Sequence, residues 1–271
     1  SLSHCGLNRI DGIKHLVNLQ YLDLEYNPIS QLPSSIELLT HLKYLNLNQW
    51  PYRNRLKDLP PVLIKMYEQF SISDDGIVQF NLEVVVTEIL AVQLKRLRIQ
   101  SICNACESNA LLASQIKSLS LNNLDLEDLP SNFGALSHLK SLSVANNQLS
   151  SLPQSFIHLS QLERLDLNHN CFTQTPKILS KISKLERLSL ENNNLNEISA
   201  LTSLYNLKIL NLRNNKLSEL PKFDFSNSMT ELHLDNNLLS NLSESLNSLS
   251  ALEELHLSQN RLSILPNMSS F

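Results

Sequence analysis

Glycine and aromatic residues are scarce in this chain of 271 residues, which has only 4 glycines and 6% aromatic side chains. A glycine-rich loop that cradles phosphate and a pocket lined by aromatic rings both need more of these residues. No apolar run approaches the ~20 residues that span a bilayer, since the longest, from Val84 to Val92, is interrupted by Thr87 and Glu88. These absences argue against a phosphate-loop enzyme and against insertion in a membrane.

An excess of positive charge is also lacking. The chain has 22 Lys and Arg against 26 Asp and Glu, which gives a formal net charge of −4. Binding to nucleic acid or to an anionic membrane surface favours a basic protein. We therefore expect neither of these partners.

Cysteine is rare as well, and its distribution predicts reduced thiols. Cys5 and Cys171 stand alone, unlike the paired clusters of a secreted disulfide scaffold, so we expect a cytoplasmic protein. The remaining two form a lone Cys103-x-x-Cys106, which is a weak motif for zinc or redox chemistry. Buried core thiols are the simpler interpretation, and the sequence leaves open whether this pair binds a metal.

What the chain has instead is leucine and asparagine, 59 and 31 residues, in a frame that repeats every 22 or 23 residues. The frame is L-x-x-L-x-L-x-x-N-x-L-x-x-L, and it starts at Leu19, Leu42, Ile116, Leu139, Leu162, Leu185, Leu207, Met229 and Leu252. Two degenerate copies fit at 67–80 and 94–99, and a truncated copy precedes the first full one, which predicts a fragment of a longer protein. We expect a single domain over 1–271, with about eleven repeats plus a truncated first one, irregular at 48–115.

The frame has a direct structural meaning. The L-x-L alternation has the period of two that buries every second side chain of a strand. The longer spacing after it, as in Leu152, Phe156 and Leu159, suits short helical or 3₁₀ turns. Residues 82–93 contain few turn signals and predict a longer helix. An asparagine amide both donates and accepts, so asparagines at the ninth position are expected to satisfy buried backbone groups. They are Asn27, Asn147, Asn170, Asn193, Asn215, Asn237 and Asn260.

This pattern resembles the leucine-rich repeat family over essentially the whole chain. The resemblance implies an α/β fold, a curved right-handed solenoid with short parallel strands on the concave face and short helices, 3₁₀ turns and loops on the convex face. Copies such as the one from Leu152 to Leu159 resemble the 23-residue intracellular Ras-suppressor-like subtype. The copies at Ile10 and Ile198 instead resemble the 22-residue phosphatase-regulator-like subtype. Mixed arrays also resemble leucine-rich repeat effectors of intracellular bacterial pathogens.

The resemblance implies a monomeric protein–protein interaction module that binds a protein partner through its concave face. We expect no enzymatic activity, cofactor or metal, because the sequence contains no Ser-His-Asp order, H-E-x-x-H, Walker or G-x-G-x-x-G motif. For a secreted bacterial effector, the partner would be a host protein and the location the host cytoplasm. The alternative is the substrate-recruiting part of a larger enzyme, such as a ubiquitin ligase, whose catalytic domain is absent from this sequence.

Aromatic residues gather in the N-terminal copies. Tyrosine and tryptophan bury a large area with few rotamers and often anchor protein interfaces. We expect the binding surface to run from these aromatics to basic residues of the middle copies: Tyr21, Tyr26, Tyr44, Trp50, Arg96, Arg98 and Lys117. The alternative for Tyr44 and Trp50 is that they only cover an irregular loop.

Two later arginines, Arg164 and Arg187, fall on the same predicted face and could pair with an acidic partner or a phosphate. Glu163 and Glu186 adjoin them in the sequence, so we expect a solvated surface of mixed charge there.

His233 and His256 occupy one column in adjacent copies, flanked by acidic residues. Adjacent strands would bring the two imidazoles close enough to bridge a metal ion. The alternative is an acidic rim whose histidines face water, and the sequence does not decide between the two.

Overall fold

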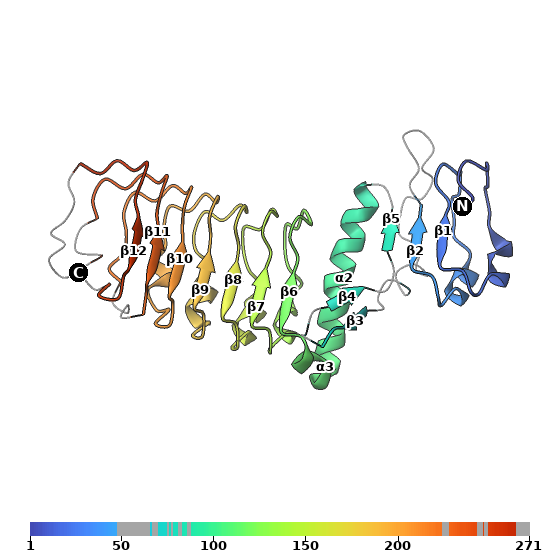
Figure 1. Cartoon of the computed structure of the whole chain (residues 1–271), viewed down its shortest axis with the longest axis horizontal. Helices are drawn as coiled ribbons and strands as arrows, with labels where there is room; N and C mark the ends of the chain where they lie inside the picture. The colour runs from blue at the N-terminus through green and yellow to red at the C-terminus, as the bar shows by residue number, and fades with distance from the viewer. Residues whose placement is uncertain are drawn as a thin grey trace. The chain divides into compact units, whose positions relative to one another are not determined.

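A computed structural model describes residues 1–47, 66, 70–74, 76, 78–80, 83–85, 88–223, 228–242, 246 and 249–263. The chain divides into two compact units, Ser1–Ile102 (unit 1) and Cys103–Phe271 (unit 2). Each unit has a parallel sheet of short strands (Figure 1). That residues 1–271 form one domain stays a prediction.

Unit 2 is built on a seven-stranded parallel sheet in which the strands follow one another in chain order. Each strand pairs with its neighbour position for position, so Leu165 lies opposite both Leu142 and Leu188. This register of one short strand per copy confirms the solenoid fold expected from the sequence. The strands are β6 (Ser118–Ser120), β7 (Ser141–Ser143), β8 (Arg164–Asp166), β9 (Arg187–Ser189), β10 (Ile209–Asn211), β11 (Glu231–His233) and β12 (Glu254–His256).

The alternation of side chains explains which residues form the core of unit 2. Leu165 and Leu188, in the middle of their strands, are buried, whereas the flanking residues are half-buried or exposed. We call the outer surface made by the first and third residues of β6–β12 the strand face. The return part of each copy contains buried apolar residues such as Phe156 and Leu179. Its 3₁₀ turns are η3 (Phe133–Ala135), η4 (Gln154–His158), η5 (Lys177–Lys181) and η6 (Ser199–Leu201).

The ninth-position asparagines bond the backbone as the sequence predicts. Asn193 is 7% exposed, and its Nδ2 donates to the carbonyl oxygens of Leu167 (3.0 Å) and Leu190 (3.1 Å). Its Oδ1 accepts from the backbone N–H of Phe172 at 3.1 Å. Since Leu167 and Phe172 belong to the preceding copy, the side chain ties two copies together. The same arrangement recurs at Asn27, Asn147, Asn170, Asn215, Asn237 and Asn260.

The residue just before each of these asparagines has a left-handed backbone, a feature that was not predicted. The φ angle is +55° at Asn146 and +54° at Asn192. Asparagine adopts this conformation more readily than most other residues with a side chain, which explains the recurrent Asn-Asn pairs. The same position is left-handed at Tyr26, His169, Asn214, Asn236 and Gln259.

Unit 1 contains a three-stranded parallel sheet in the order β1-β2-β5. Its strands are β1 (Tyr21–Asp23), β2 (Tyr44–Asn46) and β5 (Glu83–Val85), and its 3₁₀ turns are η1 (Asp11–His15) and η2 (Ser34–Leu38). Leucine and isoleucine side chains from these copies form one buried cluster. The N–H groups of Leu2 and His4 donate to the carbonyl oxygens of Asp23 and Glu25, so the truncated first copy stacks on the next one.

The prediction of a degenerate copy at 67–80 is wrong, because two strands in this segment form an antiparallel hairpin. The hairpin consists of β3 (Phe70–Ile72) and β4 (Val78–Phe80). The turn between them contains Gly76, whose φ is +81° and whose N–H donates to the carbonyl oxygen of Ser73 at 2.8 Å. A turn of this kind reverses the chain, whereas a repeat would continue into the next coil.

The degenerate copy predicted at 94–99 is also wrong, because this segment lies within the helix α2 (Glu88–Ser108). The helix α3 (Ala110–Gln115) follows it. The buried positions in α2 include Ile99, Ile102, Cys103 and Cys106, whose spacing is that of one helix face. The helix predicted at 82–93 is therefore only partly correct, since β5 occupies its first part.

Candidate protein-binding surfaces

Two of the predicted anchor residues, Tyr21 and Tyr44, lie side by side in unit 1. They are the first residues of β1 and β2 and are paired in the parallel register. Their rings stack with centroids 4.3 Å apart and planes 3° from parallel. Tyr21 is 53% exposed and Tyr44 is half-buried. Because both strands are fixed by the sheet, this pair presents an ordered aromatic surface.

Tyr26, the third predicted tyrosine, lies just after β1 in the same repeat as Tyr21. It is 42% exposed, and its ring packs on the imidazole of His4 with centroids 4.1 Å apart. The two residues have φ angles of +56° and +59°. Tyr21, Tyr44 and Tyr26 together are called the aromatic surface below.

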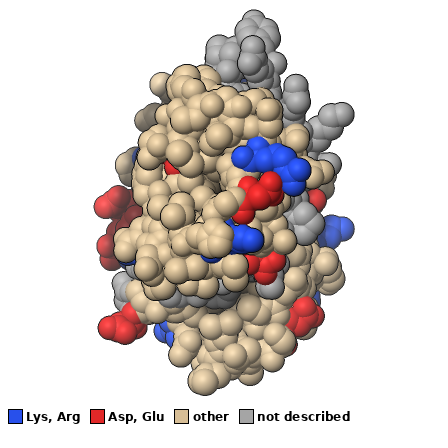
Figure 2. All heavy atoms as spheres, turned by 90° about the vertical axis from the view of Figure 1, so that its right-hand side faces the viewer, with Lys and Arg blue, Asp and Glu red and all other residues tan. Residues whose placement is uncertain are grey.

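The face turned to the viewer in Figure 2 has no large patch of basic or of acidic side chains. Uncharged residues cover most of this face; basic and acidic side chains lie next to one another near its centre, and further acidic side chains lie at its margins (Figure 2). Arg9 and Asp11 of unit 1 form an ion pair, with Nε and Oδ2 2.9 Å apart. The exposed large apolar residues of unit 1 are Leu2, Leu16, Val17, Tyr21, Tyr26 and Leu38.

The other predicted site residues are not placed together with the tyrosines on a strand. Trp50 lies outside the described residues. Arg96 and Arg98 lie on α2, so the expectation that they occupy concave strand positions is wrong. The side chain of Arg96 is outside the described part, and Arg98 is half-buried. Lys117 is a half-buried residue of unit 2 directly before β6. A binding role for these residues stays a prediction.

The strand face of unit 2 is hollowed between β7 and β11. The hollow has a volume of about 440 Å³ and is lined by residues of five consecutive strands, among them Arg164, Arg187, Asp166 and His233. This size is within the range of pockets that hold small molecules or single side chains of a partner. The outer strand positions that line the hollow were predictable from the sequence, but the hollow itself was not.

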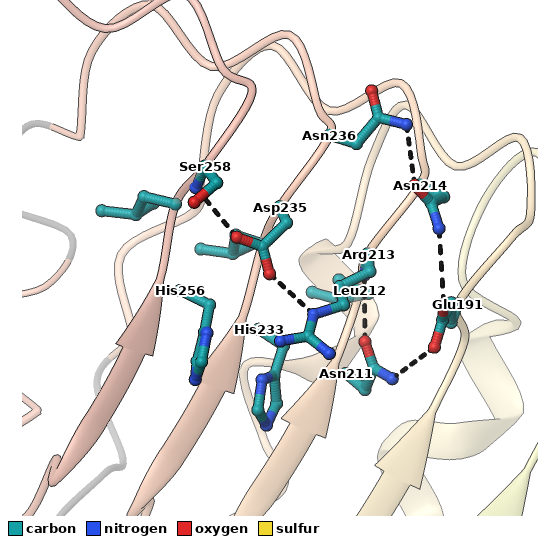
Figure 3. A network of polar contacts seen from close by, with 12 residues as sticks. Glu191, Asn211, Leu212, Arg213, Asn214, His233, Asp235, Asn236, His256 and Ser258 are labelled. Carbon is teal, nitrogen blue, oxygen red and sulfur yellow. Dashed lines mark hydrogen bonds and ion pairs between the residues drawn. The ribbon is translucent and has the colours of Figure 1, made fainter.

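A chain of hydrogen bonds orders the carboxyl ends of the strands beside this hollow (Figure 3). Asn211 donates to Glu191 at 2.9 Å, and Nε of Arg213 donates to Asp235 at 2.6 Å. The backbone N–H of Ser258 donates to the other oxygen of Asp235 at 2.8 Å. Because each bond joins neighbouring copies, these polar side chains are fixed before any partner arrives.

Burial and hydrogen bonding act in opposite directions on the Asp235 carboxyl. Burial raises its pKa, but the hydrogen bonds from Arg213 and Ser258 and the charges of Arg213 and His256 outweigh that effect. The pKa of Asp235 therefore lies below its usual value. This carboxylate remains ionised and holds Arg213 in place at neutral pH.

The predicted pairing of His233 and His256 is confirmed. They are opposite each other on β11 and β12, and their rings stack with centroids 4.6 Å apart. Nε2 of each ring lies 3.6–3.7 Å from a glutamate of its own strand, Glu231 or Glu254. Among the described residues, no group of three or more His, Cys, Asp or Glu side chains is arranged to hold a metal ion.

Cys103 and Cys106 are both buried and unoxidised on α2. Burial, together with the charges of Cys106 and Glu107, raises the pKa of the Cys103 thiol to about 12. Burial raises the pKa of Cys106 to about 11. Since the thiolate is the form that reacts and binds metals, these residues serve as core side chains.

Comparisons with known proteins agree with this architecture. A family model described as a leucine-rich repeat region matches residues 86–270, and one described as a leucine-rich repeat matches residues 18–39. No curated protein matches the sequence. An internalin of Listeria monocytogenes has a similar crystal structure, with 27% identity and a TM-score of 0.57 over 97% of this chain and 68% of that one. A leucine-rich repeat protein of Leptospira interrogans follows, with 23% identity and a TM-score of 0.49 over 98% of this chain and 85% of that one.

Within the described part of the chain, no helix has the length and apolar character needed to cross a membrane.

Proposed function

Because the chain belongs to the leucine-rich repeat family, we propose that it is an interaction module that binds a protein partner on the outer faces of its parallel strands. Leucine-rich repeat domains are typically protein-binding modules, and proteins of this family are generally not catalytic. Binding requires a surface that is ordered beforehand, since ordering it on association would cost affinity. The bonds that the ninth-position asparagines make to the preceding copy, called the asparagine ladder below, and the constant strand register provide this order.

The aromatic surface carries the proposal. Tyr21 and Tyr44 offer two stacked rings on adjacent strands, and Tyr26 adds a third exposed ring in the same repeat as Tyr21. Rigid aromatic side chains lose little entropy on binding and are common interface hot spots. The apolar character of unit 1 adds contact area around them.

The proposal extends to the kind of partner. In it, the protein is a bacterial effector, and its partner is a host protein in the host cytoplasm. The likeness to a Listeria monocytogenes internalin at 27% identity supports a bacterial source. The first residues of β6, β7, β8 and β9 are at 118, 141, 164 and 187. This spacing matches the copies that resemble the intracellular 23-residue Ras-suppressor-like subtype, whereas the strands from β9 to β11 begin 22 residues apart.

A paired capture experiment tests the proposal. The purified chain is immobilised and exposed to mammalian cytosolic lysate and, separately, to bacterial lysate, and retained proteins are identified by mass spectrometry. The same is done with a Tyr21→Ser, Tyr26→Asn variant, whose folding is checked by circular dichroism. We expect a mammalian protein to be retained by the unaltered chain and lost with the variant, because the anchor rings are gone.

The matched control is Tyr205→Ser, which removes a tyrosine of unit 2 that is 63% exposed and lies outside the strands. This variant should retain the same protein as the unaltered chain. Equal retention by the double variant would contradict a role for the aromatic surface. A partner found only in bacterial lysate would contradict the host partner but not the interaction module.

A further inference from the structure

Arg164 and Arg187 lie directly opposite each other on the strand face of unit 2. They are the first residues of β8 and β9 and are paired in the parallel register. Neighbouring strands are ~4.8 Å apart, and like charges in directly opposed positions destabilise a sheet. Both side chains are exposed, and both line the hollow. An arrangement of this kind gains stability when an anion joins the two guanidinium groups.

The acidic neighbours of these arginines in the sequence are engaged with lysines. Glu163 pairs with Lys140 at 3.0 Å, and Glu186 pairs with Lys208 at 3.1 Å. Glu163 also interacts electrostatically with Arg164, which helps to lower the pKa of its carboxyl, so the expected surface of mixed charge is present beside the arginines. Over the described residues, neither arginine has a hydrogen bond or an ion pair.

Asp166 also lines the hollow, but its oxygens have donors of their own. They accept hydrogen bonds from the hydroxyl of Ser143 at 3.0 Å and from the backbone N–H of Asn168 at 3.0 Å. The lining has two arginines against one carboxylate, which leaves one net positive charge among these three side chains. A single carboxylate balances that charge, whereas a phosphate dianion would exceed it.

We propose that Arg164 and Arg187 together bind a carboxylate of the protein partner, so that the segment lying on this part of the strand face is rich in aspartate or glutamate. The inference rests on the proposed function, because the carboxylate belongs to the partner. Guanidinium groups donate two parallel N–H bonds to a carboxylate, which makes this pairing stronger and more specific than that of a point charge.

The charge of the first residue of each strand changes sign along the sheet, and this change determines where an acidic segment of the partner can bind. The first residues of β10, β11 and β12 are Ile209, Glu231 and Glu254. This first position is therefore positive on β8 and β9, neutral on β10, and negative on β11 and β12. An acidic segment is attracted to the first region and repelled from the last, so it binds in one place along the sheet.

The test uses the full chain and a fluorescein-labelled hexaglutamate peptide, with binding followed by fluorescence anisotropy. We expect binding at low salt that weakens at about 0.5 M NaCl, since exposed charges are screened. A hexaglutamine peptide should not bind. A failure of hexaglutamate to bind at low salt would overturn the proposal. Tighter binding of an otherwise equal phosphoserine peptide would overturn the carboxylate assignment.

Variants locate the site. Arg164→Gln, Arg187→Gln is expected to weaken hexaglutamate binding at least about tenfold, because both charged donors are lost. Lys177→Gln, Lys181→Gln removes the same charge from exposed residues of η5 and should leave binding unchanged. Equal weakening by both variants would show a general charge effect and overturn the site. Melting curves confirm that the variants are folded.

The peptide assay is independent of the aromatic surface, so the two proposals can fail separately. Peptide binding that requires the arginines, without any protein captured from lysate, would contradict the proposed function alone. A protein captured through the aromatic surface and held equally by the Arg164→Gln, Arg187→Gln variant would contradict the carboxylate site alone.

Discussion

Tyr26 and Asn146 occupy the same position of their repeats and share a left-handed backbone, with φ of +56° and +55°. Asparagine is suited to this conformation, while a bulky side chain is strained in it. The tyrosine is also 42% exposed, so its ring is not needed to fill the core. The ring packs on His4 on one side and remains partly exposed, as the proposed contact with a partner requires.

Replacement of Tyr26 separates backbone strain from loss of the ring. Tyr26→Asn and Tyr26→Ala both remove the ring, but asparagine is the better residue at positive φ. We expect the asparagine variant to be more stable than the alanine variant by about 1 kcal/mol in urea unfolding. The same two changes at Tyr21, within β1, should show no advantage for asparagine. If the two Tyr26 variants unfolded at the same urea concentration, the result would contradict backbone strain at this residue.

The asparagine ladder is tested by Asn193→Ala. This change leaves the carbonyl oxygen of Leu167 and the N–H of Phe172 without their buried partner. We expect the free energy of unfolding to fall by about 1–3 kcal/mol. The neighbouring Asn194 is exposed, and Asn194→Ala should change stability by less than about 0.5 kcal/mol. Similar losses for both variants would show that propensity, and not the ladder, is responsible.

The regular copies were predictable because each residue type in the frame has one physical role. Alternating leucines predict the strands β6–β12, and a buried amide at the ninth position predicts the bonds of Asn193. The helix α2 was missed because Leu94, Leu97 and Ile99 fit the repeat frame as well as a helix. The helical spacing of Ile102 and Cys106 with Ile99 was the available signal.

The candidate sites were less predictable because they depend on contacts between copies. Glu163 adjoins Arg164 in the sequence, yet its carboxylate bonds Lys140, which is 23 residues away. Side chains of adjacent copies lie side by side on neighbouring strands, so a residue one repeat away competes with the sequence neighbour for an ion pair in a solenoid. The tyrosines Tyr21 and Tyr44 were found because they share one column.

Thiol reactivity tests the burial of the two cysteines of α2. Cys5 and Cys171 are exposed, whereas Cys103 and Cys106 are buried. With pKa values raised to about 12 and about 11, the buried thiols carry almost no thiolate at neutral pH. Ellman's reagent should therefore titrate two thiols in the native protein and four in guanidinium chloride.

A Cys5→Ser, Cys171→Ser variant provides the matching control for this titration. It should give no rapid reaction until the protein is unfolded. Fast modification of the native variant would mean that α2 opens readily or that its thiols are accessible.

The pH dependence of stability reports on Asp235. Its pKa is lowered in the folded protein, so it stabilises the fold above the usual carboxyl pKa of about 4, and this contribution is lost as the pH falls through the folded pKa. Asp235→Asn should cost about 1 kcal/mol at neutral pH, and its difference from the unaltered chain should shrink in acid.

Arg213→Gln removes the partner of this carboxylate and should produce the same pH-dependent loss. The double variant should then lose little more than either single one, because the two side chains act as a pair. Fully additive losses would show that Asp235 acts through groups other than Arg213.

The asparagine bonds give the array a polarity. Each ninth-position side chain reaches back to the backbone of the copy before it, as Asn260 does to Leu234 and Leu239. Removing a copy from the C-terminal side therefore strips partners from buried main-chain groups of its predecessor. Removing one from the N-terminal side leaves a side-chain amide to be hydrated by water, in addition to the backbone N–H groups that lose acceptors at either end. Shortened arrays should consequently survive trimming at their beginning better than at their end, and unravelling should start from the C-terminal coil.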